Sequence, residues 1–117
     1  MAGTEGMEKM IQINPREIAA EALMEIMTAD AYNTMTLRRL LRQNGAMSRQ
    51  DRAFVTEVVN GTLRNLIYID HVLNTFSKTK TDKMKPWLLA VLRTAVYQMY
   101  FMDVPAAAAC NGAGKLA

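Results

Sequence analysis

The chain has 117 residues, half of them hydrophobic, and a net charge of +3 at neutral pH. This length predicts one domain with a single core, and this share of apolar residues argues against intrinsic disorder. One cysteine excludes an internal disulfide, one histidine with one cysteine excludes a structural zinc site, and no apolar run reaches the roughly 18 residues of a membrane span. We therefore expect a cytoplasmic protein.

The first expected helix covers about residues 15–29, after a flexible leader at residues 1–12. Asn14 is a good N-cap, Pro15 suits the first helical position, and Glu17 completes a pattern like a capping box. Apolar residues then recur at steps of three and four, which predicts one buried stripe. The stripe comprises Ile18, Ala19, Ala22, Leu23, Ile26 and Met27.

A second, short helix is expected between a cap at Asn33 or Thr34 and a stop at Asn44-Gly45. Its leucines recur at helical spacing and should face the core, which leaves its arginines on the outer arc. The inward residues are Leu37, Leu40 and Leu41, and the outward ones are Arg38, Arg39 and Arg42.

The third predicted helix lies within Ser48 to Phe76 as one uninterrupted helix of about 26 residues, or roughly 39 Å at 1.5 Å per residue. Ser48 and Asp51 resemble a capping box, and the apolar seam that follows keeps its phase to Phe76. Gly61 inside a helix costs about 1 kcal/mol relative to alanine, and a close helix crossing would explain it. The alternative is a break into two helices near Asn60-Gly61.

Two further helices are expected after a polar, basic loop at residues 77–84. Pro86 opens the first of them, which is apolar nearly all round and should therefore be the central helix of the domain. Pro105 begins the second, which is rich in alanine. Since no segment alternates as a strand does, we predict an all-α bundle of about five helices.

Catalytic and metal-binding residues are not expected in this chain. The tail "NGAGK" lacks a phosphate-loop pattern, because Ala109 stands where the first glycine is needed and Leu116 follows the lysine. His71, beside Asp70, is interpreted as an exposed or ion-paired side chain, and Cys110 as a buried, unreactive thiol.

The middle third of the chain carries arginines with few acids to neutralise them. Arginine suits phosphate because its planar fork donates two parallel hydrogen bonds and keeps its charge. These arginines lie in a short helix, a turn and the next helix start, which are neighbours in space, so a polyanionic backbone is a natural ligand. They are Arg38, Arg39, Arg42, Arg49 and Arg52. The alternative is a solvated face with ordinary ion pairs.

Two arginines in apolar helices are interpreted differently. Arg64 and Arg93 lie among core-type residues, so each is expected to be structural and paired with a carboxylate such as Glu57 or Asp70.

The stretches "DRAFVTEVVNGTLRNLIYIDHVL" and "KMKPWLLAVLRTAVYQMYFMDVPAAAACNGAGKLA" resemble the NusB-like all-helical family. More specifically, residues 13–117 are similar to the N-terminal domain of the bacterial small-subunit (16S) rRNA cytosine-C5 methyltransferases, the Sun/Fmu/RsmB group. The combined pattern DRAF, GTLR, ID, LR, YQM, VP and AACN carries this resemblance.

The resemblance implies an RNA-binding domain that takes part in rRNA processing by helping to dock rRNA onto a catalytic domain absent from this chain. That domain would use S-adenosyl-L-methionine and a cysteine nucleophile, so this chain alone would hold no cofactor and catalyse nothing. The implied rRNA contacts are Arg16, Arg38, Arg39, Arg42, Arg49 and Arg52. The alternative is a NusB-type transcription antitermination factor, a module that binds a partner protein and RNA.

The sequence also departs from the family pattern. The family continues past Ala117 into two more helices, an acidic residue is common where Gly112 stands, and a larger aliphatic residue is usual at Gly114. We therefore expect a truncated domain. Its central helix would be partly uncovered, which would leave an apolar face for self-association or a groove for a partner protein.

Overall fold

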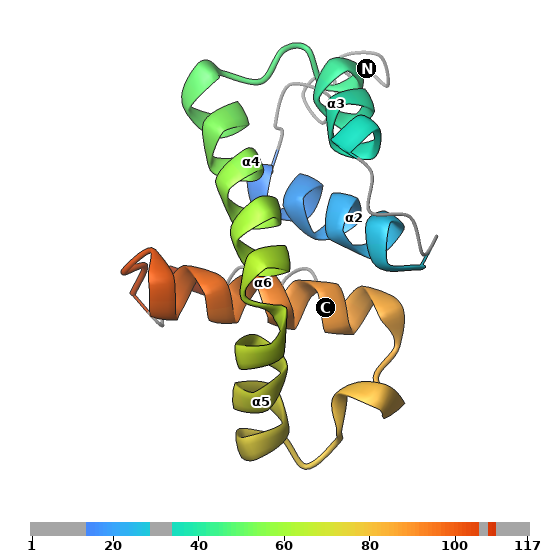
Figure 1. The fold of residues 1–117 in the computed structure, drawn as a ribbon. Coiled ribbons are helices and arrows are strands. Elements are labelled where there is room, and N and C mark those ends of the chain that lie inside the picture. Colours follow the sequence, from blue (N-terminus) through green and yellow to red (C-terminus); the bar gives the residue numbers. More distant parts are fainter. Residues whose placement is uncertain (1–13, 29–33, 106–107, 110–117) are drawn as a thin grey trace, which may run out of the picture.

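The computed structural model describes residues 14–28, 34–105 and 108–109, and Figure 1 shows their arrangement. Within these segments the chain forms α-helices and one short 3-10 turn, without any β-strand, so the predicted all-α class is confirmed. The elements are α2 (Pro15–Thr28), α3 (Thr34–Gln43), α4 (Arg49–Arg64), α5 (Leu66–Phe76), η1 (Thr81–Lys83) and α6 (Pro86–Phe101). None of these helices is long and apolar enough to cross a membrane.

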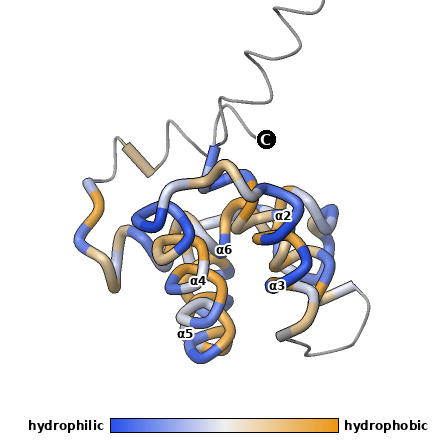
Figure 2. The backbone as a smooth tube through the Cα atoms, turned by 90° about the horizontal axis from the view of Figure 1, so that it is seen from above, coloured by the Kyte–Doolittle hydropathy of each residue, from blue (hydrophilic) through white to orange (hydrophobic). Residues whose placement is uncertain are grey.

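Helix α6 is the centre of the fold, as its nearly continuous apolar sequence predicts. It contacts α2, α4 and α5, and its residues from Ala90 to Gln98 are almost all buried. Figure 2 shows hydrophilic and hydrophobic residues alternating along α2, α4 and α5, as amphipathic helices require. The core between them includes Ile18, Val55, Ile69 and Val96.

The helix starts follow their predicted caps. The side chain of Asn14 accepts a hydrogen bond from the Arg16 backbone N–H at 3.0 Å, and the hydroxyl of Ser48 accepts one from the Asp51 N–H at 3.1 Å. In α3, Leu37 and Leu40 are buried and Leu41 is half-buried, which confirms the predicted inner face. Met27 is a correction, because it lies at the exposed end of α2 rather than in the buried stripe.

The prediction of one uninterrupted helix from Ser48 to Phe76 is wrong. Helix α4 ends at Arg64 and α5 begins at Leu66, with Asn65 between them at φ −114° and ψ 25°. The Asn65 side chain donates a hydrogen bond at 2.9 Å to the Gly61 carbonyl, which also accepts one from the Asn65 backbone N–H at 3.1 Å, so a local side-chain contact accompanies the irregular geometry there. The Ile69 N–H still bonds to the Asn65 carbonyl at 2.9 Å, which explains why the apolar seam shows no phase change.

Gly61 lies where α4 crosses α6, which confirms the expected reason for a glycine inside the helix. A Cβ atom at this position would lie 2.0 Å from Cζ of Tyr97. Only a residue without a side chain lets the two helices approach this closely. The contact between Gly61 and Tyr97 thus sets the point along α4 at which α6 crosses it.

Several expectations concern residues outside the described segments. They are the flexible leader at residues 1–12 and most of the alanine-rich helix after Pro105, including Cys110, Gly112 and Gly114.

Candidate nucleic-acid interface

An open groove of about 610 Å³ runs along one face of α4 and is bordered on one side by Leu41 of α3. Residues three or four positions apart share a helix face, and the groove residues of α4 follow this spacing over its whole length. They are Arg49, Arg52, Ala53, Thr56, Glu57, Asn60 and Arg64. Helix α4 therefore lines the groove along its whole length, from Arg49 to Arg64.

The groove carries an excess of positive charge, because three arginines and one glutamate line it, a net charge of 3 − 1 = +2. Neither Arg49 nor Arg52 has a carboxylate within ion-pairing distance in the described parts of the chain. Arg64 lies 3.7 Å from Glu57, and both side chains are about half exposed. Such an exposed pair contributes at most about 1 kcal/mol, so it leaves Arg64 able to exchange partners.

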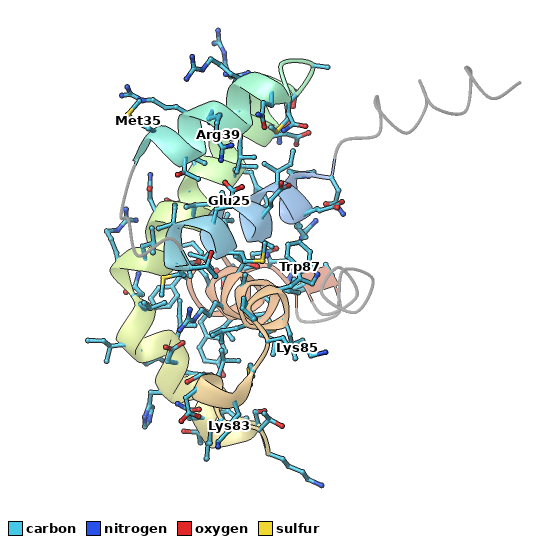
Figure 3. All side chains as sticks on the ribbon, turned by 90° about the vertical axis from the view of Figure 1, so that its right-hand side faces the viewer. Glu25, Met35, Arg39, Lys83, Lys85 and Trp87 are labelled. Atoms are coloured by element: carbon cyan, nitrogen blue, oxygen red, sulfur yellow. The ribbon has the colours of Figure 1, made fainter. Side chains whose placement is uncertain are left out.

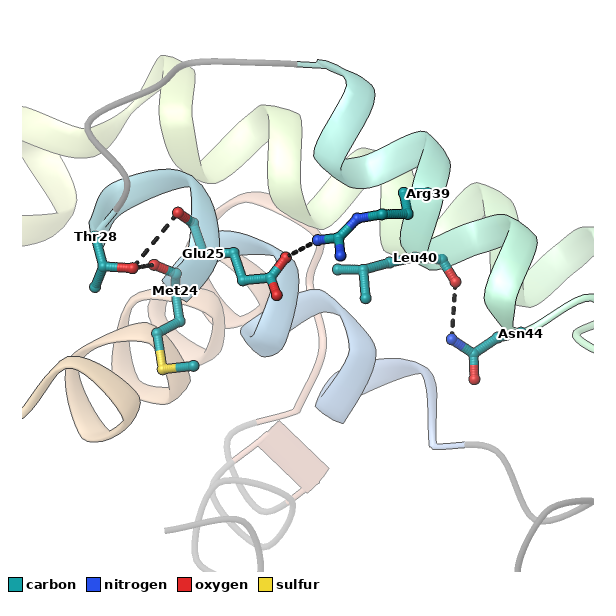
Figure 4. Close-up of polar contacts among 6 residues, drawn as sticks. All are labelled: Met24, Glu25, Thr28, Arg39, Leu40 and Asn44. Carbon is teal, nitrogen blue, oxygen red and sulfur yellow. Dashed lines mark hydrogen bonds and ion pairs between the residues drawn. The ribbon is translucent and has the colours of Figure 1, made fainter.

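The arginines of α3 divide into two kinds. Arg39 forms an ion pair with Glu25 of α2, which fastens α3 to α2 (Figures 3 and 4). Arg38 and Arg42 are exposed and, among the residues that the structure describes, have no carboxylate partner. They do not line the groove, although Leu41 beside them does.

Arg16 is half-buried and does not line the groove. Its Nε atom donates a hydrogen bond to Oε1 of Gln98 at 2.7 Å, and its guanidinium lies over the ring of Phe54 at 5.4 Å. Arg16 therefore joins α2 to α6 and α4, and one of its five N–H donors is engaged within the protein.

Two carboxylates, one on α5 and one on α4, join these helices to α6. Asp70 accepts two hydrogen bonds from the buried Arg93, each of 2.8 Å, and so ties α5 to α6. Glu57 accepts a hydrogen bond from the Tyr97 hydroxyl at 3.1 Å. Burial, and then the hydrogen bond and negative charge of Glu57, raise the pKa of the Tyr97 phenol above its usual value, so the phenol remains a donor at neutral pH.

Arg64 is the residue whose position in the groove was not foreseen. Its pairing partner, Glu57, is one that the sequence suggested, yet both residues line the groove. The available signal was the spacing of Arg52, Thr56, Asn60 and Arg64, four residues apart on one helix face.

Within the described segments no group of three or more His, Cys, Asp or Glu side chains could hold a metal ion.

Comparison with known proteins gives matches of two kinds. The model of the NusB family matches residues 13–117. "Probable ribosomal RNA small subunit methyltransferase B" of Bacillus subtilis is 37% identical over 109 residues, which cover 92% of this chain and 24% of that protein. The protein of the same name from Synechocystis is 31% identical over 106 residues, which cover 90% of this chain and 24% of that protein.

"Transcription antitermination protein NusB" of Acetivibrio thermocellus is 31% identical over 104 residues, which cover 87% of this chain and 71% of that protein. The chain thus spans about a quarter of the length of the two methyltransferase relatives and most of the length of this NusB protein. No solved structure matches at a significant level.

Proposed function

Because the chain belongs to the NusB family, we propose that it is an RNA-binding domain that binds the phosphate backbone of small-subunit (16S) rRNA. In a longer parent protein it would help to dock this rRNA onto a cytosine-C5 methyltransferase domain. S-adenosylmethionine would be bound by that second domain, which lies outside this chain. The parent protein would act in the cytoplasm.

One observation carries the proposal: arginines that have no carboxylate partner among the described residues gather on α3 and α4. Arg49 and Arg52 line the groove, and Arg38 and Arg42 are exposed on the neighbouring helix. Each can donate two parallel hydrogen bonds to a phosphate without first giving up an ion pair. Backbone contacts of this kind position an RNA without reading its sequence, which suits a docking domain.

A second function is favoured by a separate observation. The antitermination protein of Acetivibrio thermocellus is matched over 71% of its length, so a NusB-type factor that binds RNA and a partner protein remains the alternative. The complete reading frame distinguishes the two functions. Continuation into a methyltransferase domain supports the docking role, and a stop after two more helices supports the antitermination role.

Removing the positive charges of Arg38, Arg42, Arg49 and Arg52 should weaken RNA binding. We expect Arg38→Gln/Arg42→Gln/Arg49→Gln/Arg52→Gln to lower the affinity for a small-subunit rRNA fragment by about 10- to 100-fold at fixed salt. Four exposed contacts at about 0.3 to 0.7 kcal/mol each give this range. Fluorescence anisotropy with a labelled fragment measures it.

The basic loop supplies a control with the same change in net charge. Lys78→Gln/Lys80→Gln/Lys83→Gln/Lys85→Gln also removes four positive charges, and Figure 3 shows Lys83 at the opposite end of the molecule from Arg39. This variant should retain most of the affinity. An equal loss in both variants would mean that net charge, and not the surface of α3 and α4, determines binding.

A further inference from the structure

Three partly exposed rings form an aromatic cluster where α5 meets the end of α6. The cluster consists of Tyr68, Tyr100 and Phe101, which are 48%, 49% and 45% exposed. Tyr68 makes edge-to-face contacts with Phe101 at 5.7 Å and with Tyr100 at 6.3 Å between ring centroids. Phe101 in turn stacks on the buried ring of Tyr97 at 5.2 Å. The rings are therefore held in place by one another before any ligand arrives.

The aromatic cluster adjoins the Arg64 end of the groove. Tyr97 lies against Gly61, and its hydroxyl reaches Glu57, which lines the groove. Phe101 follows Tyr97 by one turn of α6, and Tyr68 follows Arg64 by about one turn along α4 and α5. Figure 1 shows α6 crossing at the junction of α4 and α5, which brings these turns together.

We propose that the groove and the aromatic cluster form one binding surface for an unpaired RNA strand. The phosphates would follow Arg49, Arg52 and Arg64, and the bases at one end of the strand would stack on Tyr68 and its neighbouring rings. This inference rests on the proposed RNA-binding function and deepens it by naming the state of the RNA. Proteins that bind single strands combine these two features, a basic groove and exposed aromatic rings.

Charge and shape favour an unpaired strand over a duplex or a protein. The bases of a duplex are stacked on each other, so their faces cannot reach the rings. A protein partner would need to match an apolar patch that ends in a groove with a net charge of +2. From Arg49 to Arg64 the groove is about 22 Å long, enough for several nucleotides of an extended strand.

The test removes the rings while it keeps apolar volume. Tyr68→Leu/Tyr100→Leu should weaken binding of an unstructured RNA of about 12 nucleotides by about tenfold or more, since each stacked base contributes on that scale. Binding of a duplex of the same length, and the salt dependence of binding, should not change. Phe76→Leu is the matched control, because Phe76 is 79% exposed at the far end of α5 and outside the aromatic cluster.

The other outcomes separate this inference from the proposed function. If Arg49→Gln/Arg52→Gln weakens binding and the tyrosine variant does not, the aromatic cluster is not part of the site, although RNA binding stands. If neither variant weakens binding, both proposals fail. Sedimentation measures self-association of the same variants. If the tyrosine variant loses self-association while its RNA affinity is unchanged, the aromatic cluster is an interface between copies of the chain and the inference is overturned.

A measurement on the unmodified protein guards against a variant that fails to fold. RNA carrying 5-iodouridine should form photo-crosslinks to Tyr68 or Tyr100, which peptide mass spectrometry locates. Crosslinks that map only to other parts of the chain would overturn the inference.

Discussion

Gly61→Ala is expected to lower the free energy of unfolding by about 2 kcal/mol or more. The added Cβ would lie 2.0 Å from Cζ, 2.1 Å from Oη and 2.4 Å from Cε1 of Tyr97, so the ring must move. Tyr97 is 4% exposed, its ring stacks on Phe101 and its hydroxyl donates a hydrogen bond to Glu57, so movement of the ring disturbs both contacts. Alanine gains about 1 kcal/mol in helix propensity, which is too little to offset this overpacking. Urea unfolding measures the change.

Gly45→Ala provides the matched control. A Cβ there would meet only the Arg42 carbonyl oxygen, at an ordinary 3.6 Å, so stability should hardly change. The cost of Gly61→Ala should also shrink when Tyr97→Leu is present, because the clashing ring atoms are then gone. Equal costs in the two backgrounds would show that the crossing of α4 and α6 is not the reason for the glycine.

Asp70→Asn is expected to lower the free energy of unfolding by about 3 kcal/mol. The substitution leaves the guanidinium of Arg93, whose side chain is 9% exposed, without a compensating charge. The carboxylate side is 25% exposed, so water relieves part of the cost and keeps it at the lower end for buried pairs. Chemical denaturation monitored by circular dichroism gives the value.

Glu25→Gln removes one partner of an exposed pair, and so it is the comparison for Asp70→Asn. Its side chain and that of Arg39 are 35% and 50% exposed, so the loss should stay below about 1 kcal/mol. The double variant Asp70→Leu/Arg93→Met should recover much of the stability, because no charge remains buried. Equal effects of Glu25→Gln and Asp70→Asn would contradict the assignment of Arg93–Asp70 as the buried link between α5 and α6.

The features that were predicted correctly from the sequence depend on residues that are close together along the chain. The caps at Asn14 and Ser48 depend on side chains within three residues of the bonds they make. The central position of α6 follows from its nearly continuous apolar sequence. The break at Asn65 has no such signature, because the apolar spacing of α5 continues that of α4. Only the backbone angles of Asn65 and the hydrogen bond from its side chain to the Gly61 carbonyl reveal it.

The candidate site was predictable in composition and less so in arrangement. Arginine spacing indicated a basic surface, and Arg49 and Arg52 share one groove. The partners of Arg16 and Arg39 come from other helices, Gln98 of α6 and Glu25 of α2. Such contacts depend on how the helices pack, and a single sequence does not give the packing.

We propose that the arginines of α3 and α4 that lack a carboxylate partner within the described segments contact RNA phosphates. The slope of log affinity against log salt concentration tests it most directly, measured on an rRNA fragment for the unmodified chain and for Arg38→Gln/Arg42→Gln/Arg49→Gln/Arg52→Gln. Each lost phosphate contact should reduce the slope by about 0.7 on a single strand, so four contacts predict a slope that is shallower by about 3. An unchanged slope would mean that these arginines do not contact phosphate.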